Sequence, residues 1–373
     1  MQTVDIAKEY PRHHYLGLDC RLTCLRNLLD YFGIRESYAT TFGMSSSFNF
    51  VYRKDGFTYP ESLEMPSCDF SQHFYPISGH RFDCMEKLAY TYSATLVGNY
   101  PDDAEGSLDR MRDFLRHGIP VMVAMSRHVL CEYTGRPTGF PEFMGPLEFG
   151  GHWVILVAVD DQHKTVILYE TDLQQPITMS QEMFQAARSI GDDHQNCFMK
   201  SRNRWVVFIP PATTPPKSDM FHTALTKTAF HMRKQQDQGR VYLGLRGLRV
   251  LADELPSWHV SDEFHEDKFK ATVWMMQLQG ETLSSGGLGR RLFASYLHQA
   301  ARICQSDSLQ AASDSCSVAA ETWRLLIART AQRVLGEGWT DLRPDPEFAP
   351  LVQTIVGSET SVVGKIEEFL CQG

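Results

Sequence analysis

Two cysteines lie one helical turn apart at the beginning of a segment with the spacing of an amphipathic helix, "LGLDCRLTCLRNLLDYFG". Asp19 is a good helix-capping residue and places Cys20 at the first helical position. The partial positive charge there favours a thiolate, whereas the Asp19 carboxylate opposes it. Cysteines in apolar helices are most often buried packing residues. Cys20 is therefore a candidate nucleophile and Cys24 a core residue.

A histidine and an acid could supply the other groups that a cysteine nucleophile needs. His152 follows two glycines and opens an apolar strand; Asp172 ends the next one, with Glu170 two residues earlier as the alternative. In an antiparallel hairpin the start of one strand lies beside the end of the next, so we expect His152 and Asp172 to meet. A base oriented by a third group is what activates a nucleophile. Cys84 and Cys131 remain weaker candidate nucleophiles, because neither begins a well-signalled helix.

Attack on a carbonyl also requires at least two hydrogen-bond donors for the negative oxygen that forms. The backbone amide of Cys20, at the helix start, is one candidate. No glutamine lies a few residues before this cysteine, so the nearest side-chain candidates are His14 and Tyr15. The loop after the helix offers further hydroxyls, those of Ser45, Ser46 and Ser47.

Composition limits the class of protein. The 373 residues are 43% hydrophobic and 22% charged, as in a soluble globular protein, and the net charge of −9 argues against a nucleic-acid partner. No apolar run is long enough to span a membrane, and the first residues do not resemble a signal peptide. Nine scattered cysteines without zinc-site spacing favour reduced thiols in the cytoplasm and no metal site.

A proline-rich stretch, "IPPATTPPKSD", divides the chain into two predicted domains, 1–210 and 219–373, joined by a linker at 211–218. The first domain is predicted to be α+β with an antiparallel sheet, and the second mainly α-helical. Predicted strands are 121–125, 152–160, 164–172 and 205–209, and 42–52 is predicted to be a loop. Predicted helices are 20–32, 107–117, 180–189, 221–234, 243–254, 264–278, 289–305 and 316–335.

Several stretches, in the same order along the chain, resemble the butirosin biosynthesis protein H family. In the first domain they are "CRLTCLRNLLDYFG", "FGMSSSFNF", "GIPVMVAM", "GHWVILVAVDD" and "ETDLQQPITMSQEMFQAARS"; in the second, "GLRGLRVLADEL" and "ETLSSGGLGRRLFASYL". The resemblance covers about residues 12–335. It implies a papain-like domain followed by a helical domain. The chain departs from the family at Asp19, where a histidine is common, and at Ser45–Ser47, where glycines are usual.

The resemblance also implies an activity in natural-product biosynthesis. An acyl group would pass from a thioester on an acyl or peptidyl carrier protein to Cys20, and then to a small amine as an amide. Cys20, His152 and Asp172 would be the catalytic residues. The phosphopantetheine-linked donor would be a substrate, and no tightly bound cofactor is expected.

Alternatives remain open at this point. The same three residues could catalyse cyclisation of a carrier-bound chain, or hydrolysis as a thioesterase or peptidase. A non-enzymatic binding module with a buried cysteine is the third class. In the second domain, the glycine turn before Arg290 and Arg291 could bind the phosphate of a pantetheine arm, although solvated arginines are at least as common in such positions.

Overall fold

The chain divides into two compact units. The first unit comprises residues 1–41, 59–68 and 88–214, and the second comprises residues 42–58, 69–87 and 215–373. The computed structural model describes residues 6–17, 19–53, 58–59, 68–69, 77–80, 83–99, 104–137, 139, 148–149, 151–190, 197–234, 241–255, 266–283, 286–336 and 347–372.

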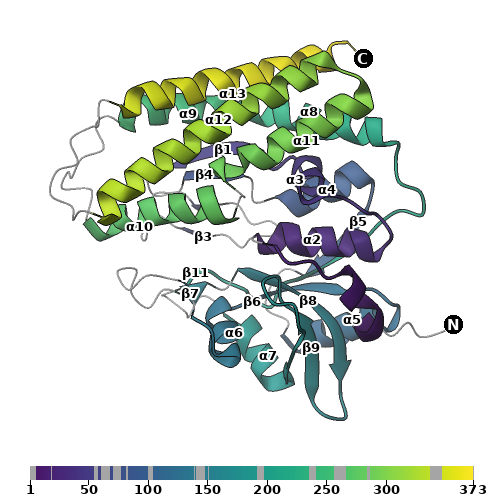
Figure 1. Ribbon diagram of the computed structural model, residues 1–373. Coiled ribbons are helices and arrows are strands. Elements are labelled where there is room, and N and C mark those ends of the chain that lie inside the picture. The colour runs from purple at the N-terminus through teal and green to yellow at the C-terminus, as the bar shows by residue number, and fades with distance from the viewer. Residues whose placement is uncertain are drawn as a thin grey trace. The chain divides into compact units, whose positions relative to one another are not determined.

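The first unit is built on a six-stranded antiparallel sheet in the order β10-β9-β8-β6-β12-β5. Every residue of β6 is buried, so both faces of the sheet are covered at this strand. Helix α2 packs against β8, as Figure 1 shows. The strands are β5 (Thr95–Asn99), β6 (Val121–Met125), β8 (His152–Asp160), β9 (Thr165–Tyr169), β10 (Ile177–Ser180) and β12 (Trp205–Ile209).

The other elements between residues 6 and 199 are mostly helices. They are α1 (Ile6–Glu9), η1 (Tyr10–His13), α2 (Cys20–Tyr31), α3 (Tyr38–Met44), α4 (Cys84–Tyr92), α5 (Ala104–Arg116), α6 (Arg127–Thr134) and α7 (Gln181–Arg188). Four short strands complete the set: β2 (Thr58–Tyr59), β3 (Cys68–Asp69), β7 (Glu148–Phe149) and β11 (Cys197–Met199).

The second unit consists mainly of helices around a small antiparallel sheet, in the order β13-β1-β4. Helices α11, α12 and α13 pack side by side (Figure 1). The Phe48 ring of β1 stacks on Phe293 of α11, with 4.2 Å between centroids. The elements are β1 (Phe48–Arg53), β4 (Ile77–His80), α8 (Lys217–Arg233), β13 (Val241–Leu243), α9 (Gly244–Glu254), α10 (Glu266–Gln277), η4 (Leu278–Leu283), η5 (Gly287–Gly289), α11 (Arg290–Cys304), α12 (Asp307–Ala331), η6 (Gln332–Gly336) and α13 (Phe348–Leu370).

The α+β fold with antiparallel sheets is confirmed, and most predicted helices and strands are present within a few residues of their expected limits. The loop predicted at 42–52 is wrong: this stretch forms the end of α3 and most of β1, which pairs with β13 and β4. The units divide between Thr214 and Pro215, inside the predicted linker, but two segments of the range 1–210 belong to the second unit. No helix among the described residues is long and apolar enough to cross a membrane.

Candidate active site

The start of α2 is held by the side chain predicted to cap it. Asp19 Oδ1 accepts hydrogen bonds from the backbone amides of Arg21 and Leu22, both at 3.0 Å. These bonds satisfy two of the amides that a helix N-terminus leaves without partners. Cys20 is therefore the first residue of the helix, as expected, and its side chain is half-buried.

The segment before the helix is anchored to the strand side of the site. The Gly17 amide donates to the carbonyl of Thr171 at 3.0 Å. A Cβ atom at position 17 would lie 2.1 Å from Thr23 Oγ1, so only glycine allows this close approach between the segment and α2.

His152, the first residue of β8, lies between an acid and the thiol. Its Nε2 is 2.6 Å from Glu170 Oε1, and both side chains are buried. The Cys20 side chain also lies beside the ring and interacts with it through hydrogen bonding and charge. Because Nε2 is engaged by Glu170, Nδ1 is the nitrogen left to face Cys20. The structure thus brings Cys20 and His152 together, as the sequence predicted.

The acid beside the histidine is Glu170, and the prediction of Asp172 is corrected. The pairing of Ile155 with Tyr169 would put His152 opposite Asp172 if β9 continued. However, β9 ends at Tyr169, and the Leu173 amide donates to the Glu170 carbonyl at 3.3 Å, closing a turn. The turn takes Asp172 out of the ladder, while Glu170 stays on the same face as His152.

Two arginines of the segment that includes α6 bind the displaced Asp172. Arg136 Nη1 is 2.6 Å from Asp172 Oδ1, and Arg127 Nη2 is 3.3 Å from Asp172 Oδ2. Arg136 also reaches the buried acid, with Nη2 3.0 Å from Glu170 Oε2. Arg136 was not predicted from the sequence, because it lies in a loop after α6 and its partners are more than thirty residues away along the chain.

The charges of the site determine the protonation of His152 and Glu170. Burial lowers the pKa of His152, but the negative charges of Glu170 and Cys20 raise it by more, to about 9. Burial raises the pKa of Glu170, but His152 and Arg136 lower it by more, to about 2. The Glu170 carboxylate also accepts the Thr171 amide at 2.9 Å. At neutral pH the pair is therefore an imidazolium beside a carboxylate.

The other candidate thiols are fully buried, unlike Cys20. Cys24 contacts the Trp153 carbonyl at 3.5 Å, and burial raises the pKa of its thiol. The expectation that Cys24 is a core residue is confirmed. Cys84 and Cys131 are 1% and 0% exposed, so a substrate cannot reach either sulfur in this conformation.

Two of the expected oxyanion donors in the first unit do not serve this role. His14 Nε2 donates to the Leu173 carbonyl at 2.7 Å, and its Nδ1 accepts from Asn27, so its one proton is already used. The Tyr15 hydroxyl is 3.4 Å from Asp30 Oδ2. Asp30 lies ten residues after Cys20 on α2, about 15 Å along the helix axis. Tyr15 is therefore far from the sulfur.

The serine candidates belong to the second unit, and their hydroxyl protons are used there. Ser45 Oγ donates to the Phe42 carbonyl, and Ser46 Oγ donates to the Ala224 carbonyl. Ser47 bonds to Ser45, and all three residues are buried. These hydroxyls complete the core around α3 and β1, so the expectation that they form an oxyanion site is corrected.

The two arginines predicted to bind a carrier arm are both engaged in ion pairs. Arg290 is fully buried and forms a two-bond pair with Glu359, with both N–O distances at 2.7 Å. It is a core residue, and the prediction for it is corrected. Arg291 lies on the surface and pairs with Glu321 at 2.6 Å. The preceding Ser284 and Ser285 lie outside the described residues.

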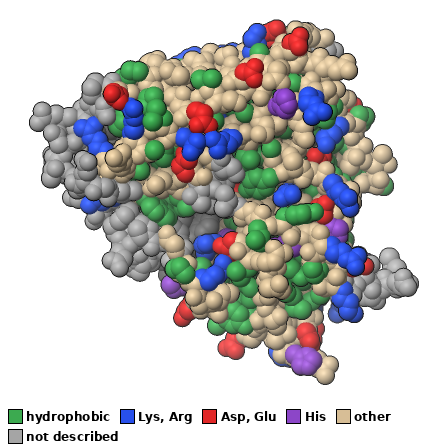
Figure 2. Space-filling model, viewed as in Figure 1, with side chains coloured by type: hydrophobic (Ala, Val, Ile, Leu, Met, Phe, Trp, Pro, Cys, Tyr) green, Lys and Arg blue, Asp and Glu red, His purple; other side chains and the backbone are tan. Residues whose placement is uncertain are grey.

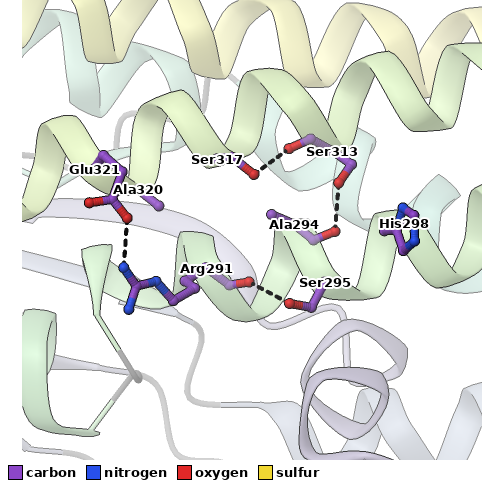
Figure 3. A pocket seen from close by; sticks show the side chains of 8 residues that line it. All are labelled: Arg291, Ala294, Ser295, His298, Ser313, Ser317, Ala320 and Glu321. Carbon is purple, nitrogen blue, oxygen red and sulfur yellow. Dashed lines mark hydrogen bonds and ion pairs between the residues drawn. The ribbon is translucent and has the colours of Figure 1, made fainter.

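Arg291 lines a groove of about 310 Å³ between α11 and α12 (Figure 3). The groove's serine hydroxyls donate to carbonyls of these helices, and its arginine points at Glu321. On the face shown in Figure 2, lysines and arginines stand among acidic side chains, so the described residues of this face form no continuous basic surface. The groove therefore contains a polar lining whose charges are already paired.

Comparison with known proteins gives one family match. Residues 185–361 match a family described as a domain of unknown function (DUF4872). The match begins in α7 and ends in α13, so it includes none of Cys20, His152 and Glu170. No curated protein matches the chain.

Proposed function

We propose that the protein is a cysteine-dependent acyltransferase that moves an acyl group from a carrier-protein thioester, through a thioester on Cys20, to a small amine. The observation that supports the proposal is the arrangement of Cys20, His152 and Glu170. An accessible thiol at a helix start lies beside a histidine, and a buried carboxylate orients that histidine. This arrangement meets the requirements for an activated nucleophile.

In the first half-reaction the Cys20 sulfur attacks the carbonyl carbon of the donor thioester. His152 holds the thiol proton as an imidazolium, stabilised by the Glu170 carboxylate. The carbonyl oxygen becomes negative while the new carbon–sulfur bond forms. When the intermediate collapses, the bond to the pantetheine sulfur breaks, and the His152 proton passes to this leaving thiolate. The products are acyl-Cys20 and a free pantetheine thiol.

In the second half-reaction an amine attacks the acyl carbon of acyl-Cys20. His152, now neutral, accepts a proton from the amine as the carbon–nitrogen bond forms. The carbon–sulfur bond then breaks and Cys20 leaves as a thiolate, restoring the pair with the protonated His152. Thioester exchange is close to thermoneutral and amide formation from a thioester is downhill, so the two steps need no nucleotide.

The donor and acceptor come from the resemblance to the butirosin biosynthesis protein H family, which also suggests the papain-like character of the first unit. Glu170 takes the place that the resemblance gave to Asp172. A carboxylate two residues earlier, pointing from the same side of the hairpin, supplies the same orientation of the imidazole. Cyclisation of the carrier-bound chain and hydrolysis use the same acyl-Cys20 intermediate and differ only in the acceptor.

Intact-protein mass spectrometry after incubation with acyl-pantetheine thioesters tests the proposal. A set of donors with short, long and aromatic acyl groups allows for the unknown acyl chain. We expect the acyl mass to appear on the wild-type protein and on Cys24→Ala, a matched variant in the same helix, but not on Cys20→Ala. Equal acylation of Cys20→Ala, or none of the wild type with any donor, would refute the proposal.

The acceptor is tested by a second measurement on the acylated protein. Isolated acyl protein is mixed with small primary amines, and the released product is identified by mass. Amide in proportion to added amine supports transfer, whereas free acid at the same rate with and without amine identifies a hydrolase. A cyclic product from a donor that carries its own amine identifies cyclisation.

A further inference from the structure

The side-chain oxyanion donors predicted from the sequence are either engaged elsewhere or far from Cys20, yet the proposed reaction creates a negative oxygen beside this residue. The start of α2 supplies one donor. The Asp19 carboxylate binds the amides of Arg21 and Leu22, and the Asp19 carbonyl binds the Thr23 amide at 2.9 Å. None of these acceptors takes the Cys20 amide, and among the described residues this amide has no other hydrogen-bond partner.

A second donor lies at the same end of the helix. Tyr38, the first residue of α3, places its hydroxyl oxygen 3.1 Å from the Asp19 amide, from which it accepts a hydrogen bond. Consecutive Cα atoms lie 3.8 Å apart, so a group bound to the Asp19 amide is within a few ångströms of the Cys20 amide. The Tyr38 hydroxyl therefore lies at the same end of the helix as the Cys20 amide, and it interacts by charge with the Cys20 thiol.

The Tyr38 hydroxyl still has its proton to give. Its oxygen acts as the acceptor toward Asp19, so the O–H remains for another partner. The buried hydroxyl of Thr23 is a hydrogen-bonding neighbour of the phenol and can donate to the second lone pair of the Tyr38 oxygen. Burial, together with the charges of Asp19 and Cys20, raises the pKa of Tyr38. The phenol therefore keeps its proton at neutral pH.

We propose that Tyr38 is a catalytic residue, whose hydroxyl donates a hydrogen bond to the negative oxygen of the tetrahedral intermediate on Cys20, together with the Cys20 backbone amide. This inference rests on the proposed acyl transfer. The Asp19 amide orients the phenol by donating to its oxygen, which leaves the O–H directed away from Asp19. A phenol held in this way is a preorganised donor, the type of group that gives large effects on acyl-transfer rates.

Tyr38→Phe tests the inference, because it removes the hydroxyl and keeps the ring. Two rates are measured on the full chain: acylation of Cys20 by an acyl-pantetheine thioester that labels the wild type, and alkylation of Cys20 by iodoacetamide. Alkylation displaces iodide and forms no oxyanion. We expect Tyr38→Phe to lower the acylation rate about 100-fold and to leave the alkylation rate within about 2-fold.

Tyr31→Phe is the matched control, since it removes the same hydroxyl from a tyrosine at the far end of α2, where it donates to the Gly118 carbonyl at 3.0 Å. We expect it to leave both rates within about 3-fold. Acylation of Tyr38→Phe within 3-fold of the wild type would overturn the inference while leaving the proposed function standing. Absence of acylation in the wild type, with normal alkylation, would overturn the proposed function itself.

A second substitution keeps the test decisive if Tyr38→Phe loses the fold, as judged by thermal unfolding. Replacing Tyr38 by 3-fluorotyrosine keeps the size of the side chain and makes its hydroxyl a stronger donor. We expect acylation to accelerate by a few-fold with unchanged alkylation. Unchanged or slower acylation would overturn the role of Tyr38.

Discussion

His152 Nε2 and Glu170 Oε1 lie 2.6 Å apart, and both side chains are almost completely removed from solvent. Glu170 is held in turn by the Thr171 amide and by Arg136. A carboxylate with this set of donors keeps its charge and fixes which ring nitrogen of His152 faces it. The other ring nitrogen is then available to Cys20.

The two acids near the histidine should differ sharply in importance. In Glu170→Gln the amide group can donate to Nε2 and so favour a proton on Nδ1, which prevents the ring from accepting the Cys20 proton. We expect acylation to fall by about 10³- to 10⁴-fold, as in other triads in which the orienting acid becomes an amide. Asp172→Asn, on the exposed side of the same turn, should change acylation by less than about 5-fold. A large loss in Asp172→Asn alone would contradict this assignment.

The titration of His152 gives a direct measure of its two charged neighbours. Glu170 and Cys20 raise its pKa from 6.5 to about 9, against the effect of burial. NMR of a sample labelled at the histidine ring carbons should therefore show one ring with a midpoint near 9. Cys20→Ser should lower the midpoint, and Glu170→Gln should lower it further, because Glu170 contributes more than Cys20. A midpoint near 6.5 in the wild type would contradict the arrangement.

The same two pKa shifts predict how stability depends on pH. The pKa of His152 is raised above 6.5, so its contribution to the free energy of unfolding is fully present below pH 6.5 and is lost as pH rises toward 9. The pKa of Glu170 is lowered from 4.5, so its contribution is present above pH 4.5 and is lost as pH falls toward 2. The difference in melting temperature between wild type and Glu170→Gln should be largest between about pH 4.5 and 6.5 and shrink above pH 9. A difference independent of pH would show that the two residues are not coupled.

The hairpin that carries these residues could be predicted from the sequence in outline but not in its final turn. The alternation and length of the apolar runs set β8 and β9, and these strands alone would have paired His152 with position 172. What decides between Glu170 and Asp172 is where β9 ends. That depends on the turn from Glu170 to Leu173 and on two arginines that bind Asp172. Those contacts are not visible in the local pattern.

The missed elements of the second unit have a similar cause. Helix α13 contains many Val, Ile and Thr residues and two glycines, Gly357 and Gly364, all of which disfavour a helix locally. Its apolar face packs against α12, and this burial outweighs the weak propensity. Strand β1 was predicted to be a loop because serines precede it, and serines in a row are typical of loops. Here their hydroxyls form hydrogen bonds within the core. Cys20, in contrast, was predicted correctly because a capping residue and a helical period are local signals.

Arg136 should act on the reaction through Glu170 as a positioning residue. It lowers the pKa of this acid, so Arg136→Met should raise that pKa, and Glu170 should take up a proton at a higher pH when the solution is acidified. The acid limb of the pH profile for Cys20 acylation should therefore move to higher pH. Arg127→Met removes a cation that pairs with Asp172, and its profile should stay in place. Equal shifts in both variants would point to a general effect of surface charge.

Gly17 should be necessary for both stability and activity. In Gly17→Ala the new Cβ would lie 2.1 Å from Thr23 Oγ1, in a helix that cannot move without shifting Cys20. Such overpacking costs about 1–3 kcal/mol of unfolding free energy, and we expect acylation to slow as well. Gly357→Ala is the control, because this glycine lies in a helix and a Cβ there would meet no atom within 4 Å. This substitution should raise the free energy of unfolding by roughly 0.5–1 kcal/mol. Urea unfolding measures both changes.

The buried pair of Arg290 and Glu359 should make Arg290→Met costly for the fold. Both side chains are 0% exposed, and Trp323 Nε1 also donates to Glu359 at 2.8 Å. Removing the arginine leaves an uncompensated carboxylate in the core, which costs about 3–5 kcal/mol. Arg291→Met breaks an exposed pair and should cost less than about 1 kcal/mol.

A double variant separates the charge effect from lost packing. In Arg290→Met with Glu359→Leu the orphaned carboxylate is gone, although the Trp323 N–H loses its acceptor. We expect the double variant to unfold at a higher urea concentration than Arg290→Met alone, because removing the second charge relieves the penalty created by removing the first. If the two substitutions add their separate costs instead, the pair stabilises the second unit through shape, and the charges contribute little.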